Sequence, residues 1–270
     1  FLHPEKVWGK KKGALKFMSR ISNQTQIRLN RKVDGDFVSN LNPFDLRTND
    51  TTLISESASW RNSLFFNRTN QIAGGDYTFS RFTNKLLLSN GFDERLSQFH
   101  QFNMRWNIKR KFTLKSAYEF GERGSFAQYT TGRDFLIRYY KIFPELSYQP
   151  DTKMRISVNF RNEDKVNVFV EDGERALIRD FGAEFRLNQP QKGTFSGTIN
   201  VLTISYNGEI NSPIGFEMLE ALRPGTNYIW TINYQRNLGK NLQLSIRYNG
   251  RKSEDNSAIH AGGVELRAMF

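Results

Sequence analysis

Strict alternation of apolar and polar side chains near the end of the chain limits its fold more than any other feature. Apolar residues take every second position in the segments 228–234, 242–248 and 264–270. A period of two is that of a β-strand with one apolar face and one polar face. The sequence therefore predicts three strands in this part of the chain.

The same alternation runs back to residue 14 and predicts nine further strands, twelve in all. These earlier segments are 15–29, 54–66, 77–88, 102–108, 112–120, 140–148, 154–160, 177–187 and 195–201. Within 77–88 the apolar residues move from odd to even positions, which predicts a β-bulge near Ser80 and Arg81.

The connections between these segments differ in length. We expect short turns at 109–111, 149–152, 188–193 and 237–241, and longer connections at 31–51, 89–97, 121–135, 162–175, 205–225 and 250–260. Short and long connections alternate through the second half of the chain, as in a barrel with one rim in the periplasm and the other outside the cell, whereas the connection at 67–76 is long for a periplasmic turn. In the loop 205–225, Phe216–Leu222 suits a short helix that ends before Arg223-Pro-Gly. Its apolar side has two candidate positions, on the rim or inside the lumen.

The composition is rich in aromatic residues and yet hydrophilic on average. The chain has 23 Phe, 10 Tyr and 4 Trp, and its mean hydropathy is −0.61. A membrane barrel has this combination because only one face of each strand meets lipid. A β-sandwich would need a larger core of Leu, Ile and Val, and a solenoid would show a fixed repeat that is absent here.

We therefore predict an all-β fold: a closed antiparallel transmembrane β-barrel of about twelve strands with short periplasmic turns and longer extracellular loops. Residues 14–270 form the barrel and residues 1–13 a periplasmic N-terminal segment. Because the chain begins with Phe1 and has no signal peptide, we expect it to be processed or to be the C-terminal domain of a longer protein.

Several other classes of protein are disfavoured. No stretch approaches the roughly 18–20 apolar residues of a membrane-spanning helix. Cysteine is absent, which excludes a disulfide scaffold and a thiolate metal site. The net charge of +12 first suggests nucleic acid, but only Lys10–Lys12 forms a cluster, so we predict no nucleic-acid partner.

On the polar face of the predicted strands, cations outnumber carboxylates. The predicted lumen cations are Lys16, Arg20, Arg28, Arg61, Arg105, Lys115, Lys141, Arg155, Arg161, Arg186, Arg247 and Arg267. Rings of Arg and Lys favour anionic solutes, so one hypothesis is a narrow anion-preferring channel of the porin type. The other is a barrel filled by interlocking side chains, which serves as a membrane anchor or a component of a multiprotein envelope complex. We favour the filled barrel.

Nothing in the sequence indicates catalysis, a cofactor or a metal. The three His residues, His3, His100 and His260, have no paired spacing for metal binding. An outer-membrane enzyme with an active site at the rim would need a Ser–His pair, for which Ser97 and Ser116 are the nearest candidates to His100. We expect His100 to belong to the band of interfacial residues at the membrane surface rather than to a catalytic site.

Two segments resemble known outer-membrane proteins. Gly262-Gly-Val-Glu-Leu-Arg-Ala-Met-Phe270 resembles the C-terminal β-signal that the barrel-assembly machinery reads, with Gly263, Leu266 and Phe270 at the signal positions and the small Ala268 as a departure. The stretches 215–228 and 249–254 look like the C-terminal end of large outer-membrane proteins of Bacteroidota. The resemblance implies an integral protein of a Gram-negative outer membrane. Its expected partners are outer-membrane lipid and lipopolysaccharide, the assembly machinery and other envelope proteins.

Overall fold

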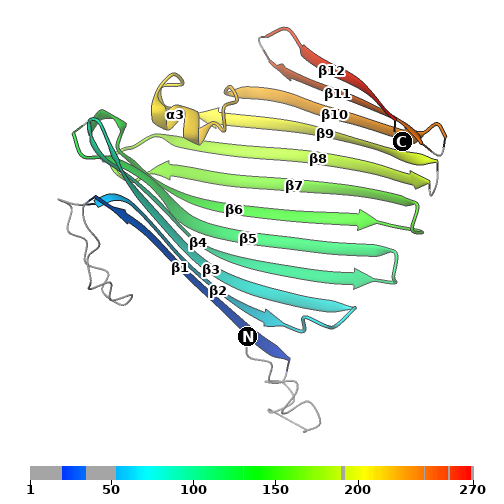
Figure 1. Ribbon diagram of the computed structural model, residues 1–270, viewed down its shortest axis with the longest axis horizontal. Coiled ribbons are helices and arrows are strands. Elements are labelled where there is room, and N and C mark those ends of the chain that lie inside the picture. Colours follow the sequence, from blue (N-terminus) through cyan, green and yellow to red (C-terminus); the bar gives the residue numbers. More distant parts are fainter. Residues whose placement is uncertain are drawn as a thin grey trace.

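The chain forms one antiparallel sheet of twelve strands, each paired with its neighbours in sequence (Figure 1). The computed structural model describes residues 20–34, 53–129, 131–189, 192–239, 241–254 and 256–268. The predicted segment 1–13, Lys16 and Phe270 lie outside these ranges. The strands are β1 (Ile21–Val33), β2 (Leu53–Phe66), β3 (Ala73–Leu88), β4 (Gly91–Ile108), β5 (Phe112–Ala127), β6 (Phe135–Tyr148), β7 (Met154–Asn167), β8 (Arg175–Gln189), β9 (Gly193–Tyr206), β10 (Gly225–Asn237), β11 (Leu242–Ser253) and β12 (Ile259–Ala268).

Helical structure in the described residues consists of a 3-10 turn, η1 (Thr131–Arg133), and one short α-helix, α3 (Pro213–Met218). No helix among the described residues has both the length and the apolar character needed to cross a bilayer.

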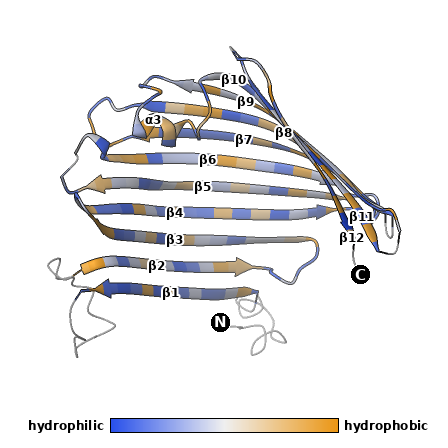
Figure 2. Ribbon diagram, turned by 45° about the horizontal axis from the view of Figure 1, so that its top comes forward, coloured by the Kyte–Doolittle hydropathy of each residue, from blue (hydrophilic) through white to orange (hydrophobic). Residues whose placement is uncertain are grey.

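The sheet is curved but open (Figures 1 and 2). Among the described residues, β1 pairs with β2 alone and β12 with β11 alone, so the two edge strands do not meet. Alternation assigns each side chain to a face but carries no information on the strand stagger that closes a barrel. The prediction of twelve antiparallel strands is confirmed, whereas closure stays a prediction.

Directly paired residues of neighbouring strands lie on the same face of the sheet, so the register divides all strands into two faces. We call the face that bears Trp60, Phe102, Tyr140, Ile199 and Val264 the outer face, and the opposite face, which carries α3, the inner face. Along each strand, hydrophilic and hydrophobic residues are interspersed (Figure 2). The predicted alternation is therefore present in the folded sheet.

The predicted bulge in β3 is wrong. Its pairing with β2 and with β4 runs through Ser80 and Arg81 without a break. A bulge leaves a residue unpaired, and in a central strand it would disturb two hydrogen-bond ladders at once. As a consequence Phe82, Leu86 and Leu88 lie on the inner face, while Arg81 and Lys85 lie on the outer face.

The long connection predicted at 89–97 is also wrong, because Gly91 already begins β4 and a tight turn at Ser89 and Asn90 joins the two strands. Gly91 has φ +96°, a conformation that favours glycine, and this allows the turn to be short. Strands at this end of the sheet are longer than predicted, because their ladders continue past the apolar segments. The other end has the compact connections at 67–72, 109–111 and 149–153, and β12 runs toward it.

Candidate functional site: the inner face and the β9–β10 loop

The long connection between β9 and β10, residues 207–224, folds back over the inner face of the sheet and carries α3 (Figure 1). Ser212 caps the helix by accepting a hydrogen bond from the backbone N–H of Gly215 at 2.9 Å, and Pro213 occupies the first turn. The helix thus begins earlier than the predicted Phe216. It ends at Met218 because Glu220 and Ala221 adopt positive φ angles of 55° and 59°.

Apolar contacts hold this loop against the sheet. Met218 is fully buried against Ile137 and Ala176, which come from β6 and β8. Leu219 is buried against Ile178 and Ile204, from β8 and β9. Of the two positions considered for the predicted helix, the structure thus places it on the inner face.

An ion-pair cluster fastens the loop next to these apolar contacts. Arg161 on β7 makes a bidentate pair with Glu220, with both guanidinium Nη atoms 3.0 Å from the two carboxylate oxygens. Lys165, two residues along the same strand, donates to Glu220 at 2.9 Å and to the carbonyl of Met218 at 3.2 Å. Charge-assisted and bidentate pairs are the stronger kind of hydrogen bond. Glu220, together with the carbonyl of Met218, therefore joins the loop to β7.

The strands beneath the loop supply two more carboxylates to this cluster. Arg161 lies 3.2 Å from Glu163 and 3.7 Å from Asp180, and Lys165 lies 3.5 Å from Glu163. The side chains of Glu163 and Lys165 are each only 4 % exposed. Two cations thus meet three carboxylates in a place from which water is largely removed, so each cation is shared by more than one carboxylate.

The electrostatics favour an ionised Glu220. Burial by itself raises the pKa of this carboxyl, but the hydrogen bonds from Arg161 and the charge of Lys165 outweigh it and lower the pKa to about 2. Glu220 is accordingly a permanent anion at neutral pH, and the loop stays attached by charge as well as by apolar contact.

A second group of charged residues lies nearer the compact end of the sheet. Glu145 accepts hydrogen bonds from Lys115 at 3.3 Å and from Arg155 at 3.0 Å, and Ser147 donates to the same oxygen at 2.9 Å. Nearer the end of the sheet with the long loops, the hydroxyl of the buried Tyr139 donates a hydrogen bond to Glu119 at 2.9 Å. These contacts link β5, β6 and β7 across their inner face.

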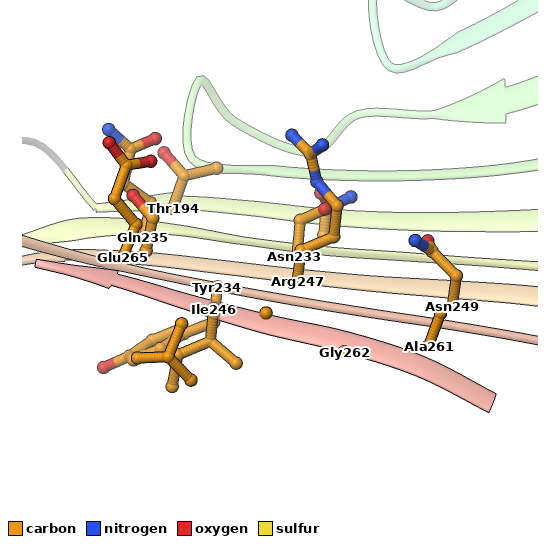
Figure 3. Close-up of a pocket in the computed structure, with 14 residues that line it drawn as sticks. Thr194, Asn233, Tyr234, Gln235, Ile246, Arg247, Asn249, Ala261, Gly262 and Glu265 are labelled. Atoms are coloured by element: carbon orange, nitrogen blue, oxygen red, sulfur yellow. The ribbon is translucent and has the colours of Figure 1, made fainter.

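The inner face of β10–β12 has a different character. Asn233, Gln235, Arg247 and Glu265 project from one side of the strands around an open cavity of about 640 Å³, while Tyr234 and Ile246 project from the other side (Figure 3). A Cβ added at Gly263 would meet nothing within 4 Å. The residues of β12 that line this cavity, 261–265, are all exposed.

The register assigns the predicted lumen cations within the described strands to one face. These are Arg28, Arg61, Arg105, Lys115, Lys141, Arg155, Arg161, Arg186, Arg247 and Arg267. Arg20 precedes β1. Only Arg161 of this set contacts the loop, while Lys165 and Glu220, which complete its cluster, were not predicted. The alternation of β7 places Lys165 on the polar face, but Glu220 lies in a loop without periodicity.

The histidines of the described strands are on the outer face and are bonded to tyrosines. Tyr77 and His100 are joined at 2.7 Å, and Tyr248 and His260 at 2.8 Å. Ser97 lies on the opposite face from His100, so these two side chains do not form a pair. Within the described ranges, no group of three or more His, Asp or Glu side chains is arranged to hold a metal ion.

Comparison with known proteins gives only distant likeness. No family model matches the chain, and no curated protein matches it. The β domain of the Bordetella autotransporter BrkA aligns with 80 % of this chain and 91 % of its own, at 8 % identity and a TM-score of 0.36. The translocator domain of the autotransporter NalP from Neisseria meningitidis aligns with 93 % of this chain and 87 % of its own, at 12 % identity and a TM-score of 0.35. Both scores are low, and we base the function on the chain's own residues.

Proposed function

We propose that this chain is an integral outer-membrane β-barrel that anchors or supports a multiprotein envelope assembly, with a lumen that is largely filled. The observation that carries the proposal is the exposed apolar band of the outer face. It includes Trp60, Leu64, Phe102, Met104, Trp106, Tyr118, Tyr140, Ile142, Leu146, Val158, Phe160, Phe181, Ile199, Tyr228, Ile232, Ile246, Val264 and Leu266. A soluble monomer rarely exposes so many large apolar side chains on one face, whereas a membrane barrel requires them.

In a bilayer the two edge strands have to find partners. Hydrocarbon offers no hydrogen bonds to a free strand edge, so a spanning sheet has to close. We therefore propose that β1 and β12 pair with each other in the membrane. The compact connections would then face the periplasm and the β9–β10 loop the outside, as the predicted alternation of turns requires.

The β9–β10 loop supports a filled lumen. It places buried Met218 and Leu219 and the Glu220 cluster where an open channel would need water. A loop held by both apolar burial and a bidentate ion pair is a fixed part of the fold rather than a mobile lid. No catalytic step belongs to the proposal: Ser97 faces the side opposite to His100, and Ser116, on the same face, is paired with Met104, four residues along β4 from His100.

A narrow anion-preferring channel is the second candidate. Among the described residues, Arg61, Lys141 and Arg247 on the inner face have no carboxylate within 4.0 Å, and such cations attract anions. Planar-bilayer recordings separate the two functions. The filled barrel predicts no stable current from the wild-type chain and an anion-selective current after deletion of residues 209–222. A stable anion current from the wild type would contradict it.

Closure is tested separately with cysteine pairs, since the chain has no cysteine of its own. We would scan pairs with one cysteine in β1 and one in β12 after insertion into outer-membrane vesicles. A disulfide needs Cα atoms within about 4.4–6.8 Å, so only directly paired strands form it. Ser245→Cys with Glu265→Cys, which are paired across β11 and β12, is the positive control. Failure of every β1–β12 pair in folded protein would rule out closure by these strands.

The proposed partners require a biochemical test. They are lipopolysaccharide at the outer rim, the barrel-assembly machinery during insertion, and other envelope proteins in the mature complex. Affinity purification from native membranes in mild detergent is expected to recover an envelope protein in stoichiometric amount. Recovery of the barrel alone would contradict the anchor hypothesis and favour the channel hypothesis.

A further inference from the structure

A cavity of about 720 Å³ lies between α3 and the inner face of β3–β6, near the end of the sheet that bears the long loops. Its size is within the roughly 300–1,000 Å³ of pockets that bind small molecules. The ion-pair cluster of Glu220 lies outside it, since that cluster involves β7 and β8. The cavity is therefore distinct from the contacts that attach the loop, and we call it the rim cavity.

One side of the rim cavity is apolar. Phe82 and Leu88 of β3 line it because the unbroken register of that strand brings them to the inner face, and they are 41 % and 45 % exposed. Phe216 lines it from α3 and is 65 % exposed, whereas Met218 of the same helix is fully buried. Three large apolar side chains thus converge on a space that neither the loop nor the sheet fills.

The other side of the rim cavity is basic. Arg95, Arg123 and Arg133 line it, with Asp93 and Glu217 as the carboxylates. Arg95 is 3.6 Å from Asp93 and Arg123 is 3.6 Å from Glu217, both longer than the usual 2.7–3.2 Å hydrogen bond. By contrast, Arg161 holds Glu220 at 3.0 Å. Arg95 and Arg123 are thus loosely paired with carboxylates, and the guanidinium of Arg123 also lies over the ring of Tyr139 at 5.1 Å from its centroid. Both side chains retain N–H donors for an additional anion.

We propose that the rim cavity binds a single-chain amphiphile with a carboxylate head. Its acyl chain would lie against Phe82, Leu88 and Phe216, and its carboxylate would accept hydrogen bonds from Arg95, Arg123 or Arg133. Three cations face two carboxylates, so the same site disfavours an ammonium head. This inference goes beyond the anchoring function and does not depend on whether the lumen conducts.

Photo-crosslinking tests the proposal on the full chain in lipid nanodiscs. The probe is dodecanoic acid with a diazirine near its end, and labelled peptides are located by mass spectrometry. We expect saturable labelling around Phe82, Leu88 and Phe216 that unmodified dodecanoate competes away. The matched dodecylamine probe should label these peptides much less. Labelling confined to outer-face residues such as Phe102 would show partition into the bilayer only and would overturn the proposal, as would equal labelling by the acid and the amine.

Substitutions give a second measurement. Phe216→Ser, on an exposed position of the loop, should lower the labelling of β3 peptides roughly tenfold, because it removes most of an aromatic contact. Arg95→Gln with Arg123→Gln should lower acid labelling and remove the preference over the amine. Phe102→Ser, an outer-face residue of similar exposure to Phe82, is the control and should leave rim labelling unchanged. Heat-dependent migration on a gel verifies that each variant is folded. A folded Phe216→Ser variant that labels like the wild type would contradict the proposed site.

Discussion

Two parts of the inner face are built from the same kinds of residues and yet behave differently. We call the inner face of β5–β9, beneath the β9–β10 loop, the covered half, and that of β10–β12 the bare half. In the covered half Arg161, Glu163 and Lys165 are largely buried and share carboxylates. In the bare half Arg267 and Glu265 pair at 3.1 Å while each remains 62 % exposed. The difference shows that a position on the inner face does not by itself bury a charged side chain. A second layer, here the β9–β10 loop, has to cover it.

The largest effect is expected from removing the central cation of the covered half. Arg161→Ala removes the ion pair of Asp180 and leaves Lys165 as the cation paired with Glu163 and Glu220, and breaking such a buried pair costs about 3–5 kcal/mol. Arg247→Ala in the bare half should cost less than about 0.5 kcal/mol. Urea unfolding in lipid vesicles measures both. Equal losses would erase the distinction between the halves.

Truncation of Met218 should come next. Its side chain is fully buried against Ile137 and Ala176, and Met218→Ala removes packing worth about 2–4 kcal/mol. The loss should fall on the loop, so hydrogen exchange of residues 207–224 is the appropriate measurement. Ile210→Ala, in the same loop but 47 % exposed, is the control and should leave exchange unchanged. Unaltered exchange in Met218→Ala would mean that other contacts hold the loop.

Substitution of one glycine in each half by alanine compares the space that the two halves leave for a methyl group. A Cβ at Gly121, on β5, would lie 2.2 Å from the carbonyl oxygen of Gln98 and 2.8 Å from Cα of Phe99. Because both are backbone atoms, the sheet has to shift, and Gly121→Ala should cost about 1–3 kcal/mol. Gly263→Ala meets open space and should be close to neutral. The midpoint of urea unfolding distinguishes them, and a neutral Gly121→Ala would show that β4 and β5 can separate without cost.

Acidification should have the smallest and most local effect. The pKa of Glu220 is lowered to about 2 in the docked loop, so the docked state binds fewer protons than the detached state. Its contribution is complete above about pH 4.5 and is lost as the pH falls through about 2. A spin label at Asn211 should therefore stay immobile to about pH 3 and gain mobility below that, while Glu220→Gln should abolish this transition. An increase in the mobility of the label near pH 4.5 in the wild type would contradict the strong pairing of Glu220 with Arg161.

Much of the sheet follows from the sequence, and the exceptions have physical reasons. The twelve alternating segments correspond to β1–β12, because a period of two is a local property of a strand. The phase change in 77–88 predicts a bulge only if all apolar residues of the strand face the same way. The structure instead keeps both ladders of β3 intact and places Phe82 on the inner face. Hydrogen bonding to two neighbours outweighed the hydrophobic pattern at that point.

By itself the sequence determined the strands, the apolar outer face and the face on which the predicted lumen cations such as Arg28 and Arg267 lie, because alternation depends only on neighbouring residues. Only the tertiary structure decided that Glu220 meets Arg161 and Lys165, and that a cavity forms between Phe82 and Phe216. These contacts join residues far apart in the chain through a loop without periodicity. Their burial, and with it their energy, depends on where that loop lies on the sheet.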